Sequence, residues 1–377
     1  MSFRLTKLEL REVRIPFRFT FKHALAERRE ANNLILTVYS DTGHAGYGES
    51  LARPYLTGET VVSAWDDIKE RWWPAVRSLA YPQSLLPTDA LRPVYQEADE
   101  ARRTGSYGGV DIAIYDLWGR VTATAGSRLF GQTPTSQVLT CPLGGGGPRS
   151  IKWISRASKV AGFRDFKLKT GRPDDELRLR MAREVLGPQR DIRVDANAAR
   201  TVEESLAMAE TLRRYNVSSL EQPIPAGDVE GLARIQHETG IDVMADESLC
   251  SREDARRLID ADATKLWNLR LAKVGGFTGF LELLDMAKRA GVRIHHGVLV
   301  GESTLLAAAA RACSGLTDFA HVEYGFPEIL LRVQPFRGGP KGVRGVGRPL
   351  IASAGLGLKP DKVVLDKVTV RKLELEG

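Results

Sequence analysis

The sequence has few cysteines, no long apolar run and no secretion signal. Its 377 residues contain three cysteines, Cys141, Cys250 and Cys313, which are too widely spaced for a CxxC site or a disulfide framework. This cysteine content suits a reducing compartment, so we expect a cytoplasmic protein. No apolar run is long enough to span a bilayer, and the opening MSFRLTKLELREV lacks the continuous apolar core of a signal peptide.

The sequence also lacks a compact basic segment. Its formal net charge is +7, but lysine and arginine are scattered among acidic residues and no nucleic-acid-binding module is recognisable. We therefore expect neither nucleic acid nor a membrane as a partner. A small anionic substrate is more consistent with this charge.

The second half of the chain contains a repeat of short apolar runs separated mostly by helical patterns. One helix is predicted from Thr201, where Thr201 and Glu204 form a capping box, and another over residues 278–291, ending at Gly291. Strands alternating with helices at this spacing predict a parallel β/α barrel. The predicted strands are QVLTCPL, FKLK, IRVDAN, SLEQP, VMADES, LWNLRL, RIHHGV and FAHVEYG.

The first part of the chain has a different pattern. KLELREVRIPF, NNLILTVYSDTG and HAGYGES predict an antiparallel sheet with a turn at residues 41–43, and the helical DIAIYDLWGRVTAT follows. After residue 340 the chain is rich in Gly and Pro and ends in the strand-like DKVVLDKVTVRKLEL. We expect an α+β domain over 1–130, a barrel over 131–340, and a return segment over 341–377 that packs on the first domain.

Acidic residues end three consecutive predicted strands: Asp195 in RVDAN, Glu221 in LEQP and Asp246 in ADES. Active-site residues of such barrels gather at strand ends, and neighbouring strands lie about 5 Å apart. Three carboxylates facing inward would repel one another unless a cation neutralised them. A single acid of this kind more often caps a helix or pairs with an arginine, but three at equivalent positions favour a Mg²⁺ site.

Lysines flank these acids. Lys167 and Lys169 in FKLK share one face of a strand, and Lys273 in NLRLAKVGG follows the third acid by one strand. A lysine near other positive charges has a lowered pKa, which makes it a useful base at physiological pH. An isolated KxK is more typical of a solvated strand face, whereas beside three acids it indicates proton transfer.

The order KxK, DxN, EQP, ADES and KxGG resembles the enolase superfamily, in its muconate-lactonizing-enzyme subgroup. The resemblance covers nearly the whole chain and implies an α/β fold: a modified (β/α)7β TIM-type barrel with an N-terminal α+β capping domain. It further implies Mg²⁺ bound by the three acids, with Mn²⁺ as a possible substitute. Lys169 and Lys273 would be acid/base groups on opposite faces of the substrate, and Lys167 would tune Lys169.

The implied reaction is abstraction of the α-proton of a carboxylate substrate through an enediolate. Protonation from the other face gives a racemase or epimerase, and ring closure gives a cycloisomerase, so an isomerase is expected. One alternative is a lyase, either a dehydratase or an enzyme similar to o-succinylbenzoate synthase, with the same site. Another is a catalytically silent barrel that acts as a binding protein. The superfamily tendency toward symmetric assemblies implies a homo-oligomer.

The resemblance assigns substrate specificity to two loops of the first domain, residues 17–30 and 50–60. Lys22, His23 and Arg53 are polar candidates there, and Tyr55 could contribute to an apolar wall or to the core. The N-terminal stretch is most similar to that of dipeptide epimerases, which carry DxD after the eighth strand. In those enzymes the DxD pairs with the dipeptide ammonium. Here the stretch is Glu323-Tyr324-Gly325, which keeps one acid as Glu323, a candidate substrate-binding residue, and lacks the second. This departure weakens the dipeptide interpretation and leaves amino-acid derivatives, muconate-like diacids and sugar acids open.

Four further residues lie near the predicted site. Asn197 belongs to the first acidic motif, and Glu302 follows the seventh strand, where we expect a supporting role. His295 and His296 lie on that strand, and one of them could be a histidine base. A structural role is the simpler interpretation, because Lys273 already occupies the position of the second base.

Overall fold

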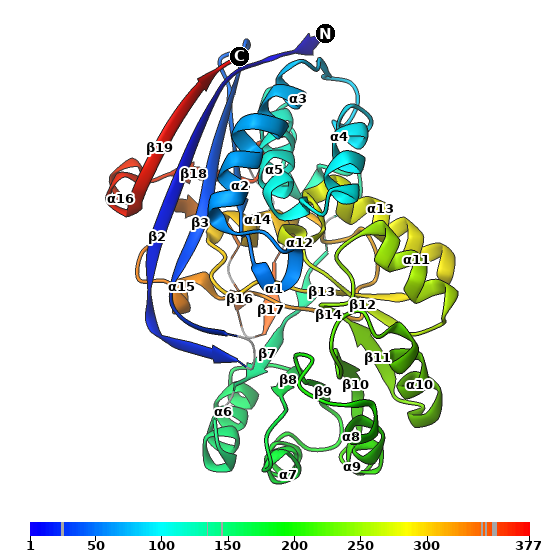
Figure 1. Ribbon diagram of the computed structural model, residues 1–377. Coiled ribbons are helices and arrows are strands. Elements are labelled where there is room, and N and C mark those ends of the chain that lie inside the picture. The colour runs from blue at the N-terminus through cyan, green and yellow to red at the C-terminus, as the bar shows by residue number, and fades with distance from the viewer. Residues whose placement is uncertain (24–25, 134, 145, 341, 344, 349–352) are drawn as a thin grey trace.

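The structure is a computed structural model that describes residues 1–377 except 24–25, 134, 145, 341, 344 and 349–352. The side chains of residues 22, 23, 26, 342 and 343 are also outside the description. Figure 1 shows a parallel barrel below a group of helices, with a long antiparallel sheet along one side. No helix in the described part of the chain is long and apolar enough to cross a membrane.

The barrel is one sheet of eight strands in sequence order, and every neighbouring pair is parallel. The last strand is much shorter than FAHVEYG predicts, and the strand in LWNLRL ends before Arg270. The strands are β7 (Thr140–Leu143), β8 (Asp165–Lys169), β9 (Asp191–Asp195), β10 (Val217–Glu221), β11 (Asp242–Ala245), β12 (Leu266–Leu269), β13 (Arg293–His296) and β14 (His321–Val322).

Helices follow the strands and cover the outside of the barrel. The capping box at Thr201 and Glu204 is present, but the helix it starts is interrupted at Met208 and forms two short pieces. The helix before Gly291 ends there with Gly291 at φ 69°, as the sequence predicts. The outer helices are α6 (Pro148–Val160), α7 (Asp175–Leu186), α8 (Val202–Ala207), α9 (Ala209–Arg214), α10 (Val229–Thr239), α11 (Arg252–Asp260), α13 (Gly276–Ala290) and α14 (Thr304–Ala312). The single turn α12 (Leu271–Val274) follows β12 and is buried.

The first part of the chain forms a four-stranded antiparallel sheet in the order β19-β2-β3-β4. It contains β2 (Leu5–His23), β3 (Ala26–Ser40) and β4 (Ala45–Ser50), with a turn at residues 41–43. The C-terminal strand β19 (Thr369–Glu376) pairs with β2, and Figure 1 shows the two side by side. Helices α2 (Val61–Asp67), α3 (Trp73–Arg77), α4 (Thr88–Glu100) and α5 (Thr104–Val121) follow the sheet in the chain.

One expectation for the C-terminal segment is wrong. The first half of DKVVLDKVTVRKLEL is not a strand but the helix α16 (Lys362–Val368). The side chain of Asp361 accepts a hydrogen bond from the backbone N–H of Val364, which makes Asp361 an N-cap. Leu365 and Val368 lie three residues apart on the buried face of this helix, so a helical period competes with the alternating one.

Three carboxylates of the first domain cap helices of the barrel. Glu49 on β4 accepts hydrogen bonds from the backbone N–H and hydroxyl of Ser303, at the start of α14. Asp111 on α5 accepts from the N–H groups of Phe277 and Thr278 at the start of α13. Asp99 on α4 accepts from the N–H of Arg252, the first residue of α11. Because helix N-termini carry unpaired N–H groups and partial positive charge, these contacts fix the first domain on the barrel.

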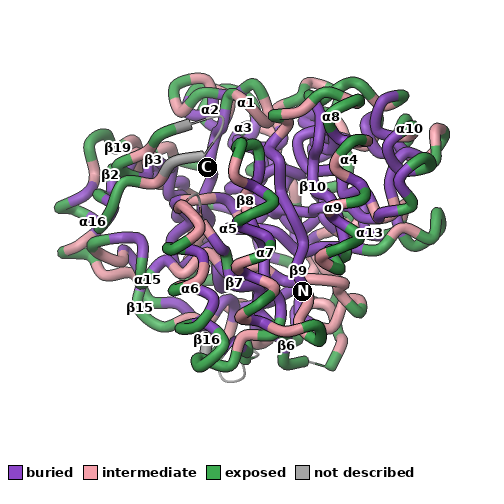
Figure 2. Tube along the Cα trace, turned by 90° about the horizontal axis from the view of Figure 1, so that it is seen from below, coloured by how far each residue is buried: buried purple, intermediate pink, exposed green. Residues whose placement is uncertain are grey.

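Burial follows the same arrangement. Figure 2 shows buried segments in the middle of the molecule and exposed ones along its outline. The apolar core of the first domain is continuous with that of the barrel. Trp72 is fully buried, stacks edge-on against Tyr107 and donates to the hydroxyl of Ser106. A shared core and shared helix caps hold the barrel mouth in a fixed relation to the first domain.

Replacing Asp111 by Ala should lower the free energy of unfolding by about 2 kcal/mol, because two buried N–H groups and the Thr278 hydroxyl lose their acceptor. Urea denaturation followed by circular dichroism measures this. Asp89→Ala is the matched control, since Asp89 is an exposed acid in the first turn of α4 and should change stability by under about 0.5 kcal/mol. Equal loss in both variants would contradict the capping role of Asp111.

Glu49 predicts a pH dependence of stability. Burial raises the pKa of Glu49 to about 7 in the folded protein, above its ordinary value of 4.5. The folded state then holds a proton that the unfolded state releases, so this contribution is fully present below about pH 4.5 and is lost as pH rises to about 7. As the pH rises from 4.5 to 7, the unfolding free energy of the wild type should fall by about 3 kcal/mol more than that of Glu49→Gln, which has no carboxyl group at this position. Parallel slopes for both proteins in urea titrations from pH 4.5 to 7.5 would contradict this.

Candidate active site

The predicted acids and lysines meet at the carboxyl ends of the barrel strands. Lys169, Asp195 and Glu221 are the last residues of β8, β9 and β10, and they are register neighbours across these strands. Asp246 follows β11 directly. Lys273 is not on a strand but on α12, a single turn of helix after β12. The strand order β8 to β12 therefore places a lysine on either side of a row of three acids.

Lys169 lies against the first acid. Its Nζ donates to Oδ2 of Asp195 at 2.7 Å and to Oδ1 of Asn197 at 2.5 Å. Asn197 has φ 45°, a left-handed conformation that is uncommon for a residue other than glycine, and its N–H donates to Oδ1 of Asp195. Asn197 thus orients both the acid and the lysine from one side.

Lys273 lies against the third acid. Its Nζ donates to Oδ1 of Asp246 at 3.0 Å and to the backbone carbonyls of Asp246 and Asn268 at 2.7 and 2.9 Å. Lys273 is fully buried, whereas the side chain of Lys169 is 27% exposed. The two amines therefore occupy different surroundings, one enclosed and one partly open to solvent.

Lys167 lies deeper in the barrel and bridges several carboxylates. Its Nζ is 3.2 Å from both Oδ2 of Asp195 and Oε2 of Glu221, and it also pairs with Glu323. Burial opposes its charge, but Glu221 and Glu323 outweigh that and raise the pKa of Lys167. The FKLK motif thus holds one permanently charged lysine among acids and a second lysine nearer the mouth.

Two residues that the sequence analysis missed complete the row. Nη2 of Arg270 lies 2.5 Å from Oδ2 of Asp246 and 3.5 Å from Oε1 of Glu221, and the Asn268 amide donates to Oε1 of Glu221 at 2.8 Å. The motif NLRLAK contains both residues. The strand argument that located Lys273 also places Arg270 just after β12, but it does not show that its side chain turns back toward Asp246 and Glu221.

Gln222, also missed, positions the third acid. Its side-chain oxygen accepts from the N–H groups of Asp246 and Ser248 at 3.0 Å, and its amide donates to the Ser248 hydroxyl and the Ile224 carbonyl. Its backbone has φ 35°, another left-handed non-glycine residue at the mouth. Such conformations persist where the surrounding contacts enforce them, often at functional sites.

The three acids differ in charge state because their neighbours differ. Burial opposes ionisation of Asp195, but Lys169 and Lys167 hold its pKa well below the ordinary value. Arg270 and Lys273 likewise lower the pKa of Asp246 against the effect of burial. Burial, and then the charge of Asp195, raise the pKa of Glu221. The negative charge of Glu221, in the middle of the row, is thus the least compensated of the three.

The resemblance to the enolase superfamily implies a divalent metal, and the donor chemistry at the mouth fits one. Asp195, Glu221 and Asp246 are completely buried and offer only oxygen atoms, the ligands that Mg²⁺ prefers. However, the cations Lys167 and Arg270 each contact two of these acids. Accordingly, the described triplets of possible ligand atoms within 4.8 Å of one another are Glu221–His295–Glu323 and Asp165–Asp191–His321, not the predicted triplet. Metal binding by Asp195, Glu221 and Asp246 therefore stays a prediction.

Two further buried carboxyl groups border the site. Burial, and then the charges of Asp246 and Asp195, raise the pKa of Glu247 to about 8, and its Oε1 accepts from the amide of Asn197 at 3.3 Å. Burial also raises the pKa of Glu302 to about 8, although the N–H of Leu299 donates to it. Burial thus favours the protonated form of both groups and limits the negative charge that they add beside the row.

The histidines of β13 have structural surroundings. Burial, and then the charge of Arg193, lower the pKa of His295 to about 3, and its Nε2 lies 3.6 Å from Oε1 of Glu323. The His296 ring packs against the rings of Phe280 and Phe319. A neutral His295 beside an ionised Glu323 belongs to the barrel interior below the row of acids.

Glu323 and Tyr324 have separate surroundings. Glu323 immediately follows β14, and burial is outweighed by the charge of Lys167, which holds the pKa of Glu323 well below the ordinary value. The hydroxyl of Tyr324 instead bonds to Glu328 and to the Pro340 carbonyl, and the ring packs on Phe326. Glu323 is therefore occupied by partners from within the barrel.

The predicted specificity residues are described in part. Arg53 is 2% exposed, donates to the carbonyls of Ala52 and Val300, and has no ion-pair partner in the described part of the chain. Burial, and then the nearby charge of Arg28, lower the pKa of Arg53 to about 10. The Arg28 guanidinium lies 6.0 Å from the centre of the Tyr55 ring. The side chains of Lys22 and His23 fall outside the described residues.

Comparison with known proteins identifies the family. The family described as enolase C-terminal domain-like matches residues 152–364. The chain belongs to this family. The resemblance to the enolase superfamily that the motifs indicated is therefore confirmed.

The similar proteins are racemases and epimerases. The N-succinyl-L-Arg/Lys racemase of Bacillus cereus is 26% identical over 81% of this chain and 82% of its own length. A hydrophobic dipeptide epimerase of Citrifermentans bemidjiense is 29% identical over 86% and 89% of the two chains. A crystal structure of a dipeptide epimerase from Cytophaga hutchinsonii, in complex with Mg and D-Ala-L-Val, has a TM-score of 0.86, 26% identity and coverage of 98% and 99%. These relatives confirm the predicted fold and the predicted enzyme class, an isomerase.

Replacing Lys167 by Met should lower the free energy of unfolding at pH 7 by about 3–5 kcal/mol, because Asp195, Glu221 and Glu323 lose a shared buried cation. The loss should be smaller at pH 5, where these acids can take up protons. Urea denaturation at both pH values measures it. Lys69→Met is the control, since Lys69 is exposed and pairs with its neighbour Glu70. An unchanged stability of Lys167→Met at pH 7 would contradict the bridging role.

Proposed function

We propose that the chain is a Mg²⁺-dependent racemase or epimerase that moves the α-proton of a carboxylate substrate between two lysines. The observation that carries the proposal is the position of the two amines: Lys169 lies on the first acid of the row and Lys273 on the last. A substrate between them would present opposite faces of its α-carbon to the two nitrogens. This arrangement suits proton removal on one face and proton return on the other.

Asp195, Glu221 and Asp246 would hold the metal ion. When bound, Mg²⁺ would supply positive charge beside the substrate carboxylate, which makes the α-proton more acidic. A cation among these acids would compete with Lys169 for Asp195 and with Lys273 for Asp246. That competition would weaken the ion pairs that stabilise the charged form of both lysines. It would therefore favour the neutral amine that proton abstraction requires.

The reaction is then a transfer between two nitrogen atoms. The neutral amine of one lysine accepts the α-proton, and the negative charge that develops on the substrate is stabilised by the ammonium of the other lysine. That ammonium returns a proton to the opposite face and inverts the configuration. The same two groups exchange roles for the other enantiomer, so each serves once as base and once as acid.

An N-acylated amino acid fits the site better than a free dipeptide. Glu323, the acid kept from the DxD position, is already paired with Lys167 and lies beside His295, so it is not open to a dipeptide ammonium. Arg53 instead offers a buried guanidinium without a carboxylate partner among the described residues. An acyl group that ends in a carboxylate would satisfy Arg53. We retain dipeptide epimerisation, cycloisomerisation and lyase-type elimination as alternatives.

The remaining assignments rest on the sequence. We propose a capping domain over 1–130, a catalytic barrel over 131–340 and a return segment over 341–377. We also propose a homo-oligomeric, cytoplasmic enzyme in which Mn²⁺ can replace Mg²⁺. The three cysteines are free and buried, which is consistent with a reducing compartment.

Deuterium exchange tests the assignment of the lysines. With Mg²⁺ in D₂O, the wild type should exchange the α-proton of both enantiomers of an N-succinyl amino acid and interconvert them. Lys169→Ala and Lys273→Ala should each lose interconversion by at least about 10³-fold, because one proton carrier is missing. Each variant should still exchange one enantiomer, and not the same one. Lys152→Ala on α6 is the control and should retain activity.

Several outcomes separate the alternatives. Retained interconversion in either lysine variant would contradict its role as an acid/base group. A ring-closed product would support a cycloisomerase, and loss of water would support a lyase. The substrate panel also includes free dipeptides, muconates and sugar acids, so that failure with N-succinyl amino acids tests only the substrate class.

Metal binding tests the row of acids separately. Glu221→Gln should weaken Mg²⁺ binding by at least about tenfold, because it removes the central oxygen donor. Lys169→Ala should bind Mg²⁺ at least as tightly as the wild type, since Lys169 competes for an oxygen of Asp195. Isothermal titration calorimetry measures both. Unchanged affinity in Glu221→Gln would contradict the predicted ligand set.

A further inference from the structure

A second cluster of metal-binding side chains lies at the other end of the barrel. Asp165 and Asp191 are the first residues of β8 and β9, the strands whose last residues are Lys169 and Asp195. His321 is the first residue of β14. Four residues of extended strand separate the two ends, about 13 Å. The cluster is therefore outside the candidate active site and takes no part in the proposed reaction.

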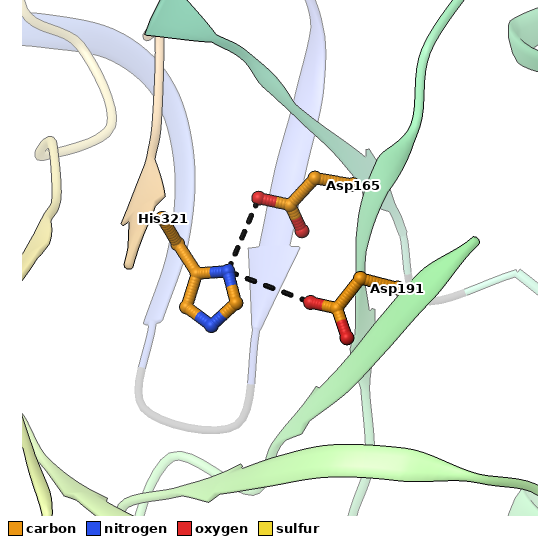
Figure 3. A group of neighbouring side chains, drawn as sticks. All are labelled: Asp165, Asp191 and His321. Carbon is orange, nitrogen blue, oxygen red and sulfur yellow. Dashed lines mark hydrogen bonds and ion pairs between the residues drawn. The ribbon is translucent and has the colours of Figure 1, made fainter. Parts of the chain in front are cut away.

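Figure 3 shows the His321 ring facing the two carboxylates. Its Nδ1 is 3.3 Å from Oδ2 of Asp165 and 3.4 Å from Oδ2 of Asp191, and the three ligand atoms lie within 4.8 Å of one another. Asp165 and Asp191 are direct register partners on neighbouring strands. Two like charges in that relation repel unless a cation compensates them.

Hydrogen bonding alone does not satisfy this cluster. A ring nitrogen carries at most one proton, so Nδ1 of His321 can donate to one carboxylate only. Asp165 already has further donors, since Arg193 and the Thr140 hydroxyl both bond to it. Oδ2 of Asp191 is buried and has no hydrogen-bond partner among the described residues. A group that accepts electron pairs from all three atoms at once would satisfy the nitrogen and both carboxylates.

We propose that Asp165, Asp191 and His321 bind a divalent transition-metal ion, with Zn²⁺ the first to test. Ligand atoms at about 2.0 Å from a tetrahedral Zn²⁺ lie about 3.3 Å from one another. The two distances from Nδ1 of His321, 3.3 and 3.4 Å, match that spacing. An imidazole nitrogen favours Zn²⁺ and similar ions over Mg²⁺, so this site differs in preference from the all-oxygen row at the mouth.

Neighbouring groups support the ligands. Arg193 donates to Oδ1 of Asp165 at 2.7 Å and to the Thr140 hydroxyl at 2.8 Å, and that hydroxyl donates to Oδ2 of Asp165. Such contacts orient a carboxylate for metal binding. The three ligands line a cavity of about 750 Å³ together with residues such as Gln189 and Thr317. The cavity provides an entry path and room for a water molecule as the fourth ligand.

The bound ion would close a gap in the barrel. In the described part of the sheet, β14 and β7 are the two edge strands, and no backbone pairing joins them. His321, at the start of β14, contacts Asp165 and Asp191 at the beginnings of β8 and β9. A metal held by all three side chains would therefore tie the last strand to the start of the barrel and stabilise the folded state.

Zinc titration of the full-length chain tests the proposal. The protein is freed of metal with a chelator and kept in excess Mg²⁺, which occupies oxygen-donor sites. Calorimetry should then show one Zn²⁺ per chain, and the melting temperature should rise with Zn²⁺. Asp191→Asn and His321→Gln should each weaken Zn²⁺ binding by more than about tenfold and lose the rise in melting temperature. Co²⁺ should give visible absorption bands in the wild type that both variants lack.

His237→Gln is the matched control. His237 is an exposed histidine whose Nε2 lies 3.9 Å from Asp262, and its loss should leave Zn²⁺ binding unchanged. Without metal, Asp191→Asn should melt at or above the wild-type temperature, because it removes a like charge beside Asp165; this variant decides the question if His321→Gln does not fold. No Zn²⁺ binding by the wild type, or equal binding by wild type and Asp191→Asn, would overturn the proposal.

Discussion

The structure depends on a balance of buried charge at the barrel mouth. Asp195, Glu221 and Asp246 can be buried together only because Lys167, Lys169, Arg270 and Lys273 lie between and beside them. Isolated charges of this kind could not be removed from water without a large cost in free energy. The same pairing keeps two amines beside the place where a carboxylate substrate would bind. The same charge pairs therefore stabilise the barrel mouth and place the groups that would carry out the proposed proton transfer.

The first domain contributes to this balance from outside the barrel. Its carboxylates on β4, α4 and α5 cap the helices α14, α11 and α13, which surround the mouth. Each contact replaces water at a helix N-terminus and fixes the orientation of a barrel segment. Arg53 of the first domain also contacts the barrel, because its guanidinium donates a hydrogen bond to the Val300 carbonyl. The two domains thus share polar groups as well as an apolar core, which makes the cap part of the site's geometry.

The positions of the strand-end acids and of Lys169 could be predicted from the sequence, because strand ends are readable; their roles in catalysis and metal binding stay a prediction. A parallel strand that ends in an acid or a lysine places that side chain at the same edge as its neighbours, so strand position alone was enough to bring Lys169, Asp195 and Glu221 together. Arg270 and Gln222 were missed although they stand in the same motifs, because their roles depend on which way long side chains turn. Residues 362–368 were misassigned since alternation and helical period coincide there, and the N-cap at Asp361 decides between them.

The order of strands, the residues at their ends and the family all follow from the sequence, because period and spacing are local properties of the chain. The partners of those residues depend on the three-dimensional fold. It turns Glu323 into the barrel toward Lys167 and His295, although the motif suggested a substrate-binding acid. It also brings His321, more than a hundred residues distant in the chain, beside Asp165 and Asp191. Such contacts form because the curvature of the sheet brings its last strand close to its first ones, and this curvature cannot be inferred from short stretches of sequence.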